Sequence, residues 1–241
     1  MIRAKFGVDS HGGKRMTAQS YSGGIMAARF RSIRLKSRDE FDWMIEHMTH
    51  EAYRARDNWD FWGAMEKAFE EYWRELNETP AFWEMTRRAH QDAVALRLGR
   101  LYDPHRTATS LGNLLQTIKE NVSCPGVVVP ASVAGLDLTE LDSELVAVSD
   151  DDPIVGKLLL IRNEYLAHRG TRHVTKGTFA SLPTLERDEI SALVARALGI
   201  LRKYRERLGY RPLLWGHHEE EQFYRLLSLV RAGRTSEELA H

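Results

Sequence analysis

The residues of this chain best suited to chemistry lie in the stretch RNEYLAHRG, which begins at Arg162. Cleavage of RNA without a metal ion needs a group that moves a proton and a group that stabilises negative charge on the phosphoryl oxygens. A histidine can act as acid or base near neutral pH, and an arginine carries a permanent, forked charge. His168 and Arg162 supply these two groups, and Asn163 could orient the histidine or the ribose.

The same stretch also allows a structural interpretation. It follows PIVGKLLLI, an apolar helix that we expect to begin at Pro153 after an N-cap at Asp151 or Asp152. A helix that leaves the core gathers polar residues. Arg162 and His168 could therefore cap this helix and contact acidic side chains without doing any chemistry.

Helix geometry favours a second copy of the chain if the site is catalytic. In a straight helix, six residues place His168 about 120° around the axis from Arg162 and ~9 Å along it. One helix therefore cannot readily present both groups to one phosphate, whereas a copy related by a two-fold axis could supply the missing group. We predict a homodimer in which the two motif helices face each other.

The sequence predicts that the elements that position this motif are all helices. Ser37 and Glu40 form a capping box in SRDE, ahead of apolar residues at helical spacing. A second helix is expected to be capped by Asp57, and a third to run from Pro80 to Leu101. Further helices are expected at 111–118, 138–148, 153–168, 190–204 and 219–232. No strand alternation is present, so the predicted fold is an all-α bundle.

Composition and charge limit the class of protein. The chain has 241 residues, of which 43% are hydrophobic and 28% charged, which is typical of a globular protein. No apolar run is long enough for a bilayer and no secretion signal opens the chain, so we expect a cytoplasmic protein without membrane contact. A single cysteine, Cys124, cannot form an internal disulfide or a cysteine metal cage.

Charge is unevenly distributed and suggests the domain boundaries. Residues 1–38 hold nine of the 34 Lys and Arg residues and one of the 34 Asp and Glu residues, so the remainder has a net charge of −8. We expect residues 1–36 to be a flexible basic leader, in preference to a functional arm that grips phosphates, and 37–232 to be one domain. An irregular insertion is predicted at 122–137, where prolines and glycines surround a valine run, and a flexible tail at 233–241.

Three other features have a chemical and a structural interpretation. His217 and Glu221 have metal-ligand spacing in HHEEE, but a third ligand is missing and a solvated helix start is favoured. His90 is interpreted as a half-buried structural histidine. An aromatic row could stack bases, but its spacing favours core packing or a dimer face. Its members are Trp59, Phe61, Trp62, Phe69, Tyr72 and Trp73.

Two stretches resemble a known family. RNEYLAHR resembles the active-site signature of the HEPN superfamily, small helical bundles that include many RNases of toxin, anti-phage and RNA-processing systems. ALRLGRLYDPHRTATSLGNLLQTI resembles the AbiU-type abortive-infection branch of that superfamily. The resemblance implies a HEPN-like helical bundle with extra helices. It places the catalytic arginine, polar residue and histidine on Arg162, Asn163 and His168, and Gly170 stands where nucleotidyltransferase-paired toxins have a tyrosine.

The resemblance also frames two functional hypotheses. The first is a metal-independent endoribonuclease without cofactors, in a phage-defence or toxin–antitoxin setting, which cleaves RNA through the ribose 2′-hydroxyl and leaves a 2′,3′-cyclic phosphate. RNA and an antitoxin or another defence component are then the expected partners. The second is a catalytically inactive HEPN-like module that binds nucleotides or proteins, because some members of the superfamily are silent.

Overall fold

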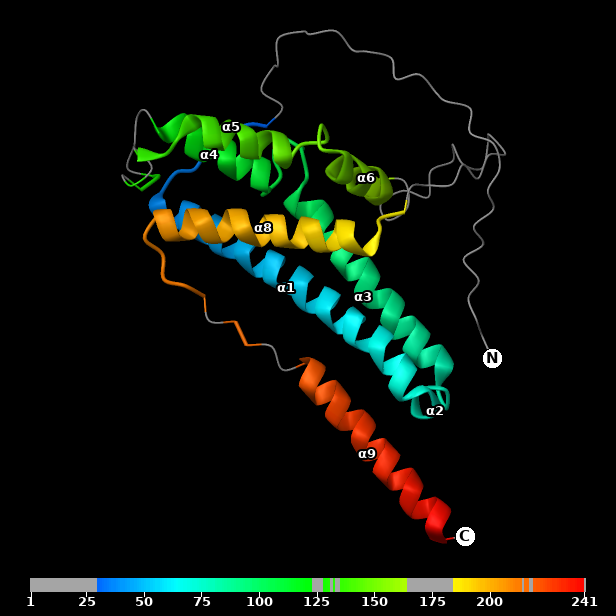
Figure 1. The fold of residues 1–241 in the computed structure, drawn as a ribbon. Coiled ribbons are helices and arrows are strands. Elements are labelled where there is room, and N and C mark those ends of the chain that lie inside the picture. The colour runs from blue at the N-terminus through cyan, green and yellow to red at the C-terminus, as the bar shows by residue number, and fades with distance from the viewer. Residues whose placement is uncertain are drawn as a thin grey trace, which may run out of the picture.

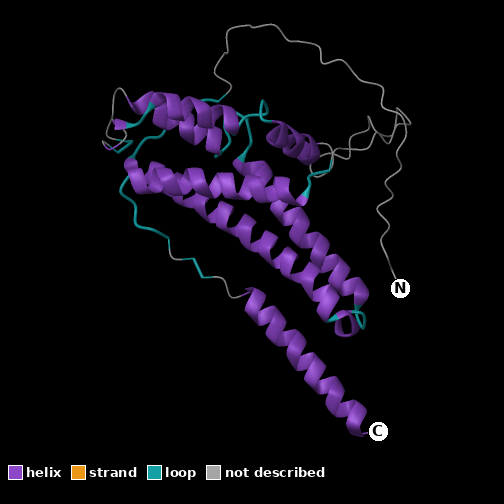
Figure 2. Ribbon diagram, in the orientation of Figure 1, coloured by secondary structure: helices purple, strands orange, loops and turns teal. Residues whose placement is uncertain are grey.

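Helices make up the regular structure of this chain. The computed structural model describes residues 30–122, 128–130, 132, 135–163, 184–213, 215–216 and 219–240. Within these residues there are eight helices and no strand, which confirms the predicted all-α class (Figure 2). They are α1 (Arg38–Glu71), α2 (Trp73–Leu76), α3 (Pro80–Leu101), α4 (Leu111–Val122), α5 (Leu138–Ala147), α6 (Pro153–Ile161), α8 (Arg187–Arg207) and α9 (Glu219–Ala240).

The longest helix, α1, begins where the sequence predicts. The Ser37 side chain accepts a hydrogen bond from the Glu40 N–H at 3.2 Å, and Glu40 accepts one from the Lys36 N–H at 2.6 Å. The predicted second start at Asp57 is wrong, because α1 continues through it without a break. Asp57 instead accepts a hydrogen bond from the Trp215 indole N–H at 2.8 Å. Its carboxylate therefore serves a tertiary contact and caps no helix.

Helices α1 and α3 form an antiparallel pair. The other helices pack against this pair in two places, a large core and a smaller cluster. Helix α8 lies along α1, while α4, α5 and α6 lie on the other side of α8 in the view of Figure 1. Buried side chains of these six helices form one core, and its largest members include Phe41, Ile45, Met48, Tyr102 and Tyr204. A smaller cluster, which includes Phe223 and Leu227, fixes α9 to the far end of α1.

An extended segment, residues 30–36, crosses α4 before α1 begins. The Phe30 ring is 4% exposed and lies directly over Gly112, where an added Cβ would be 2.2 Å from the ring. The Arg31 N–H donates to Asn113 Oδ1 at 3.0 Å, and the Ile33 N–H donates to Thr117 Oγ1 at 2.9 Å. The packed part of the chain therefore includes residues that the predicted boundary at residue 36 assigns to a leader.

Two further boundaries differ from the sequence-based prediction. Helix α9 extends to Ala240, so most of the tail predicted at 233–241 is helical. Helix α6 ends at Ile161, whereas the predicted helix runs to residue 168. A π-type turn follows at Arg162 and Asn163, the last described residues before residue 184. Of the predicted insertion at 122–137, the described residues between α4 and α5 contain no α-helix. None of the described helices has the length and apolar character needed to span a membrane.

Candidate RNA-cleavage site at the end of α6

The start of α6 is fixed to α8 by charged side chains. Asp152 caps α6, where its carboxylate accepts hydrogen bonds from two backbone N–H groups of the first turn at 2.9 and 3.1 Å. The same carboxylate pairs with Arg196 of α8 at 3.0 Å. Lys157 donates to both carboxylate oxygens of Glu189 at 2.6 and 2.7 Å, and this contact lowers the pKa of Glu189. These contacts fix the position of α6 relative to α8 and thereby the position of its last turn, where Arg162 follows.

The Arg162 guanidinium is held by three contacts at that last turn. Its Nη1 donates to the Gly99 carbonyl at 2.9 Å and pairs with Asp103 Oδ2 at 2.7 Å. Its Nε donates to Asn163 Oδ1 at 3.0 Å. The side chain is 21% exposed. The arginine is therefore neither buried as a core strut nor free in solvent, and its orientation is determined.

Counting donors shows what this guanidinium still offers. A guanidinium has five N–H groups in a fixed plane. The hydrogen bonds to Asn163 and Gly99 use the Nε group and one N–H of Nη1, and Asp103 forms an ion pair with the same Nη1. Within the part of the chain that the structure describes, no acceptor contacts the two N–H groups of Nη2. A planar pair of donors of this kind suits a phosphoryl group.

Gly99 is what lets Arg162 lie across α3. It is in the last turn of α3, it is buried, and a Cβ added to it would be 2.6 Å from Arg162 Cδ and 3.1 Å from Cγ. Real Cβ atoms do not approach other carbons so closely, so any side chain here would displace the arginine. A glycine inside a helix costs roughly 1 kcal/mol relative to alanine. At position 99 glycine is nevertheless required, because a larger residue would leave no room for the Arg162 side chain.

Asp103 is held by the loop that follows α3. Its Oδ1 accepts a hydrogen bond from the His105 N–H at 2.9 Å, which leaves Oδ2 directed to Arg162. The loop is in turn anchored by Asn113, whose Nδ2 donates to the carbonyls of His105 and Ala108 at 2.9 and 2.8 Å. Asn113 is fully buried. The loop that positions the carboxylate is thus tied to the core.

Asn113 gives a stability prediction, since its side chain also accepts the hydrogen bond from the Arg31 N–H. We expect Asn113→Ala to lower the free energy of unfolding by about 3 kcal/mol, because three hydrogen bonds of roughly 1 kcal/mol each are lost. Urea unfolding measures the change. The matched control is Asn121→Ala on the same helix, which removes one hydrogen bond, from Asn121 Nδ2 to the Thr117 carbonyl. Equal losses in the two variants would contradict this account.

The residues predicted from the sequence are only partly placed. Arg162 and Asn163 are brought together, with Asn163 Oδ1 toward the arginine. His168 lies outside the described residues, as does His217 of the candidate metal cluster. No group of three potential metal ligands exists among the described residues. His90 Nδ1 donates a hydrogen bond to Asn58 Oδ1 at 2.9 Å, and burial lowers the pKa of His90, in keeping with a structural histidine.

The aromatic row divides between core and surface. Trp59 and Tyr72 are 8% and 7% exposed, and the Trp59 ring stacks on Trp62 with centroids 4.6 Å apart. Phe69 and Trp73 are 36% and 57% exposed. Phe61 and Trp62 are partly buried and pack against the two cores. The core interpretation therefore holds for four of the six residues, and Phe69 and Trp73 lie on the surface.

Sequence reasoning missed two residues of the site, Gly99 and Asp103. Both lie in ALRLGRLYDPHRTATSLGNLLQTI, the stretch that carries the second resemblance. An isolated glycine in an otherwise helical pattern is a recognised sign of close packing, so Gly99 could have been singled out. Nothing in the sequence relates Asp103 to Arg162, because the pair is separated by 59 residues and formed by tertiary packing.

An all-α bundle with an aimed arginine at the end of a short apolar helix matches the HEPN class that the sequence resembles. A comparison with models of protein families matches residues 38–222 to AbiU2, a HEPN family. This match covers more than half of the chain, which therefore belongs to the AbiU2 family of HEPN proteins and is of the abortive-infection type. No curated protein and no solved structure matches the chain.

Proposed function

We propose that this protein is a metal-independent endoribonuclease whose site is formed by Arg162, Asn163 and His168 in a homodimer. The observation that carries the proposal is the orientation of Arg162, which is fixed by Gly99 and Asp103, while no acceptor among the described residues contacts the two donors of Nη2. The family to which the chain belongs supports the same reading. In this proposal the guanidinium stabilises charge on the phosphoryl oxygens during cleavage.

The reaction proposed is a transesterification within RNA. The ribose 2′-oxygen attacks the adjacent phosphorus, a base accepts the 2′-hydroxyl proton, and the bond from phosphorus to the 5′-oxygen breaks. An acid then donates a proton to the departing 5′-oxygen. The products are a 2′,3′-cyclic phosphate and a 5′-hydroxyl. His168 is proposed to move one of these protons, since imidazole titrates near neutral pH.

The Arg162–Asp103 pair also favours a second candidate function. An arginine that only fastened the end of α6 to the end of α3 would make the same two contacts. The protein would then be a catalytically inactive module that binds nucleotides or a protein partner. The two candidates differ in one measurable property, because only the first consumes RNA.

The deciding experiment is cleavage of end-labelled single-stranded RNA in EDTA, with the chemical ends of the products mapped. We expect cleavage by the unaltered protein, 2′,3′-cyclic phosphate ends, and loss of at least about 100-fold in rate in His168→Ala. Arg162→Lys is expected to be nearly as damaging as Arg162→Ala, because a point charge lacks the two-pronged geometry.

Two results would count against the proposal. A well-folded His168→Ala protein with full activity would remove His168 from the site. Activity that disappears on adding EDTA would identify a metal enzyme and return attention to the cluster at His217. Thermal unfolding of each variant separates loss of chemistry from loss of fold.

A further inference from the structure

The proposed cleavage reaction needs two groups that move protons, and His168 can supply only one of them. A base must take the proton of the ribose 2′-hydroxyl, and an acid must give a proton to the departing 5′-oxygen. An imidazole exchanges protons near neutral pH, so any histidine close to Arg162 is a candidate for the second group. The histidines in the part of the chain that the structure describes are His47, His50, His90 and His105.

Three of these histidines have contacts that do not lead to Arg162. The rings of His47 and His50 pack on tryptophans, with ring centroids 4.9 and 5.7 Å apart. His90 is bonded to Asn58 at 2.9 Å. Among the described residues, none of the three shares a hydrogen-bond partner with the arginine.

His105 is bonded directly to the carboxylate that holds Arg162. Asp103 accepts a hydrogen bond from the His105 N–H through Oδ1 at 2.9 Å and pairs with Arg162 through Oδ2 at 2.7 Å. One carboxylate therefore joins the backbone of the histidine to the guanidinium. The His105 carbonyl accepts a hydrogen bond from the buried Asn113 at 2.9 Å. The fold thus fixes the backbone of His105 relative to the arginine on both sides of the residue.

The ring of His105 is oriented by Thr107. Nδ1 lies 2.9 Å from Thr107 Oγ1, whereas the Thr107 N–H is 3.4 Å from the same nitrogen. The shorter contact is the stronger one, and it fits a ring whose Nδ1–H donates to the hydroxyl oxygen. In that tautomer the lone pair lies on Nε2. No described residue forms a hydrogen bond with Nε2, so this nitrogen is available as a base.

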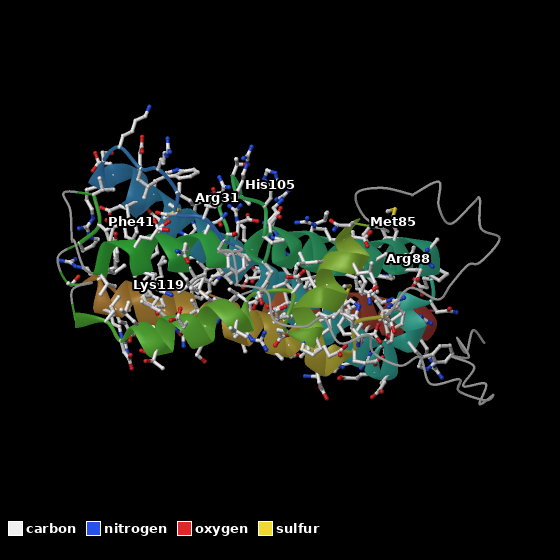
Figure 3. The ribbon with its side chains drawn as sticks, turned by 90° about the horizontal axis from the view of Figure 1, so that it is seen from above. Arg31, Phe41, Met85, Arg88, His105 and Lys119 are labelled. Atoms are coloured by element: carbon white, nitrogen blue, oxygen red, sulfur yellow. The ribbon has the colours of Figure 1, made fainter. Side chains whose placement is uncertain are left out.

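His105 is also accessible to a polymer. Its side chain is exposed, as are those of Arg106 and Thr107, and Figure 3 shows it pointing outward from the molecule. An RNA strand can therefore reach the ring without a change in the core. The charge of Asp103, the acid bonded to the His105 backbone, is balanced by Arg162. Arg106 adds a positive charge beside the histidine.

We propose that His105 is the general base of the cleavage, which leaves the acid step to His168. His105 Nε2 accepts the proton of the ribose 2′-hydroxyl while the 2′-oxygen forms its bond to phosphorus. The bond from phosphorus to the 5′-oxygen breaks, and that oxygen takes a proton from the acid. The protonated His105 ring then releases its proton to water. The inference rests on the proposed function, because it assigns the second proton transfer of the same reaction.

The test compares two RNA substrates that differ in the leaving atom. One is ordinary RNA, and the other has sulfur in place of the 5′-oxygen at a single cleavage position. A thiolate departs without a proton because a thiol is far more acidic than an alcohol. Relative to the unaltered protein on the same substrate, His105→Ala should be slower by about 100-fold or more on both, since a better leaving group does not replace a base. His168→Ala should be slow on ordinary RNA and recover on the sulfur substrate.

Two further variants separate the chemistry from local structure. Thr107→Val keeps the imidazole and removes the hydroxyl that orients it, so its loss should be smaller than that of His105→Ala and equal on the two substrates. The matched control is His47→Ala, which removes another exposed histidine and should cleave both substrates like the unaltered protein. Thermal unfolding should show that His105→Ala is folded, because its bonds to Asp103 and Asn113 are made by the backbone.

The possible outcomes can be told apart. Full activity of His105→Ala on ordinary RNA would overturn the inference and leave the proposed function standing. Recovery of His105→Ala on the sulfur substrate would also overturn it, because His105 would then be the acid. If the unaltered protein cleaves neither substrate in EDTA, the proposed function is rejected and the role of His105 with it.

Discussion

Replacing Gly99 by alanine is expected to lower RNA cleavage on the order of 100-fold, although Gly99 has no side chain that could contact RNA. The new Cβ would lie 2.6 Å from Arg162 Cδ, so the guanidinium must move by roughly 1 Å. Displacement of a catalytic group by about that distance can cost about 100-fold in rate. The same movement would lengthen the contacts of Nη1 with the Gly99 carbonyl and with Asp103.

Stability should change much less than activity in this variant. Alanine gains roughly 1 kcal/mol over glycine inside a helix, whereas overpacking costs about 1–3 kcal/mol, so the two effects largely offset. The matched control is Gly199→Ala on α8, where an added Cβ meets nothing within 4 Å. That variant should be up to about 1 kcal/mol more stable and fully active. Unchanged cleavage in Gly99→Ala would mean that the position of Arg162 does not matter to the reaction.

The starts of two helices could be predicted from the sequence, unlike the packing of Arg162 against Gly99. The start of α1 follows from local chemistry, because a side-chain oxygen at Ser37 and a carboxylate at Glu40 satisfy backbone groups within one turn. The start of α6 follows in the same way from Asp152 and Pro153. Capping and proline rules act over a few residues, so they can be read from the chain alone.

Asp57 shows why such rules also fail. An aspartate followed by apolar residues at helical spacing is a good N-cap, but its carboxylate is used by Trp215, which lies 158 residues further along the chain. Asp103 was missed for the same reason, since its partner Arg162 is brought to it only by the packing of α6 against α3. Contacts between distant segments decide both cases, and no local pattern encodes them.

The candidate site likewise combines features that local sequence predicts with features that only tertiary packing shows. Residue types and spacing led to Arg162 and Asn163, which the structure places in contact. What holds Arg162 in place, namely a missing Cβ at Gly99 and a carboxylate at Asp103, is visible only once α3 and α6 lie side by side (Figure 1). Sequence thus identified the group proposed to act, and the structure identified the groups that aim it.

The second large effect concerns the proposed dimer and is expected when two inactive variants are mixed. Arg162→Ala and His168→Ala should each lose RNA cleavage, for different reasons. The sequence-based prediction of a straight helix through both positions separates them by about 120° around the axis and ~9 Å along it, which favours a site made from the arginine of one copy and the histidine of the other. A dimer that contains one copy of each variant would then retain one intact site of two.

The expected activity of the mixture follows from counting. Random exchange of subunits at equal concentrations makes about half of the dimers mixed, and one of two sites in each is complete, so cleavage should return to about a quarter of the unaltered level. If each site is built within one chain, every mixed dimer has one site without Arg162 and one without His168, and nothing returns. Light scattering before and after mixing verifies the dimer, and a monomer at working concentration would remove the basis of this prediction. A mixture of Arg162→Ala with Gly99→Ala is the matched control, because both changes damage the arginine and neither copy can supply an aimed one.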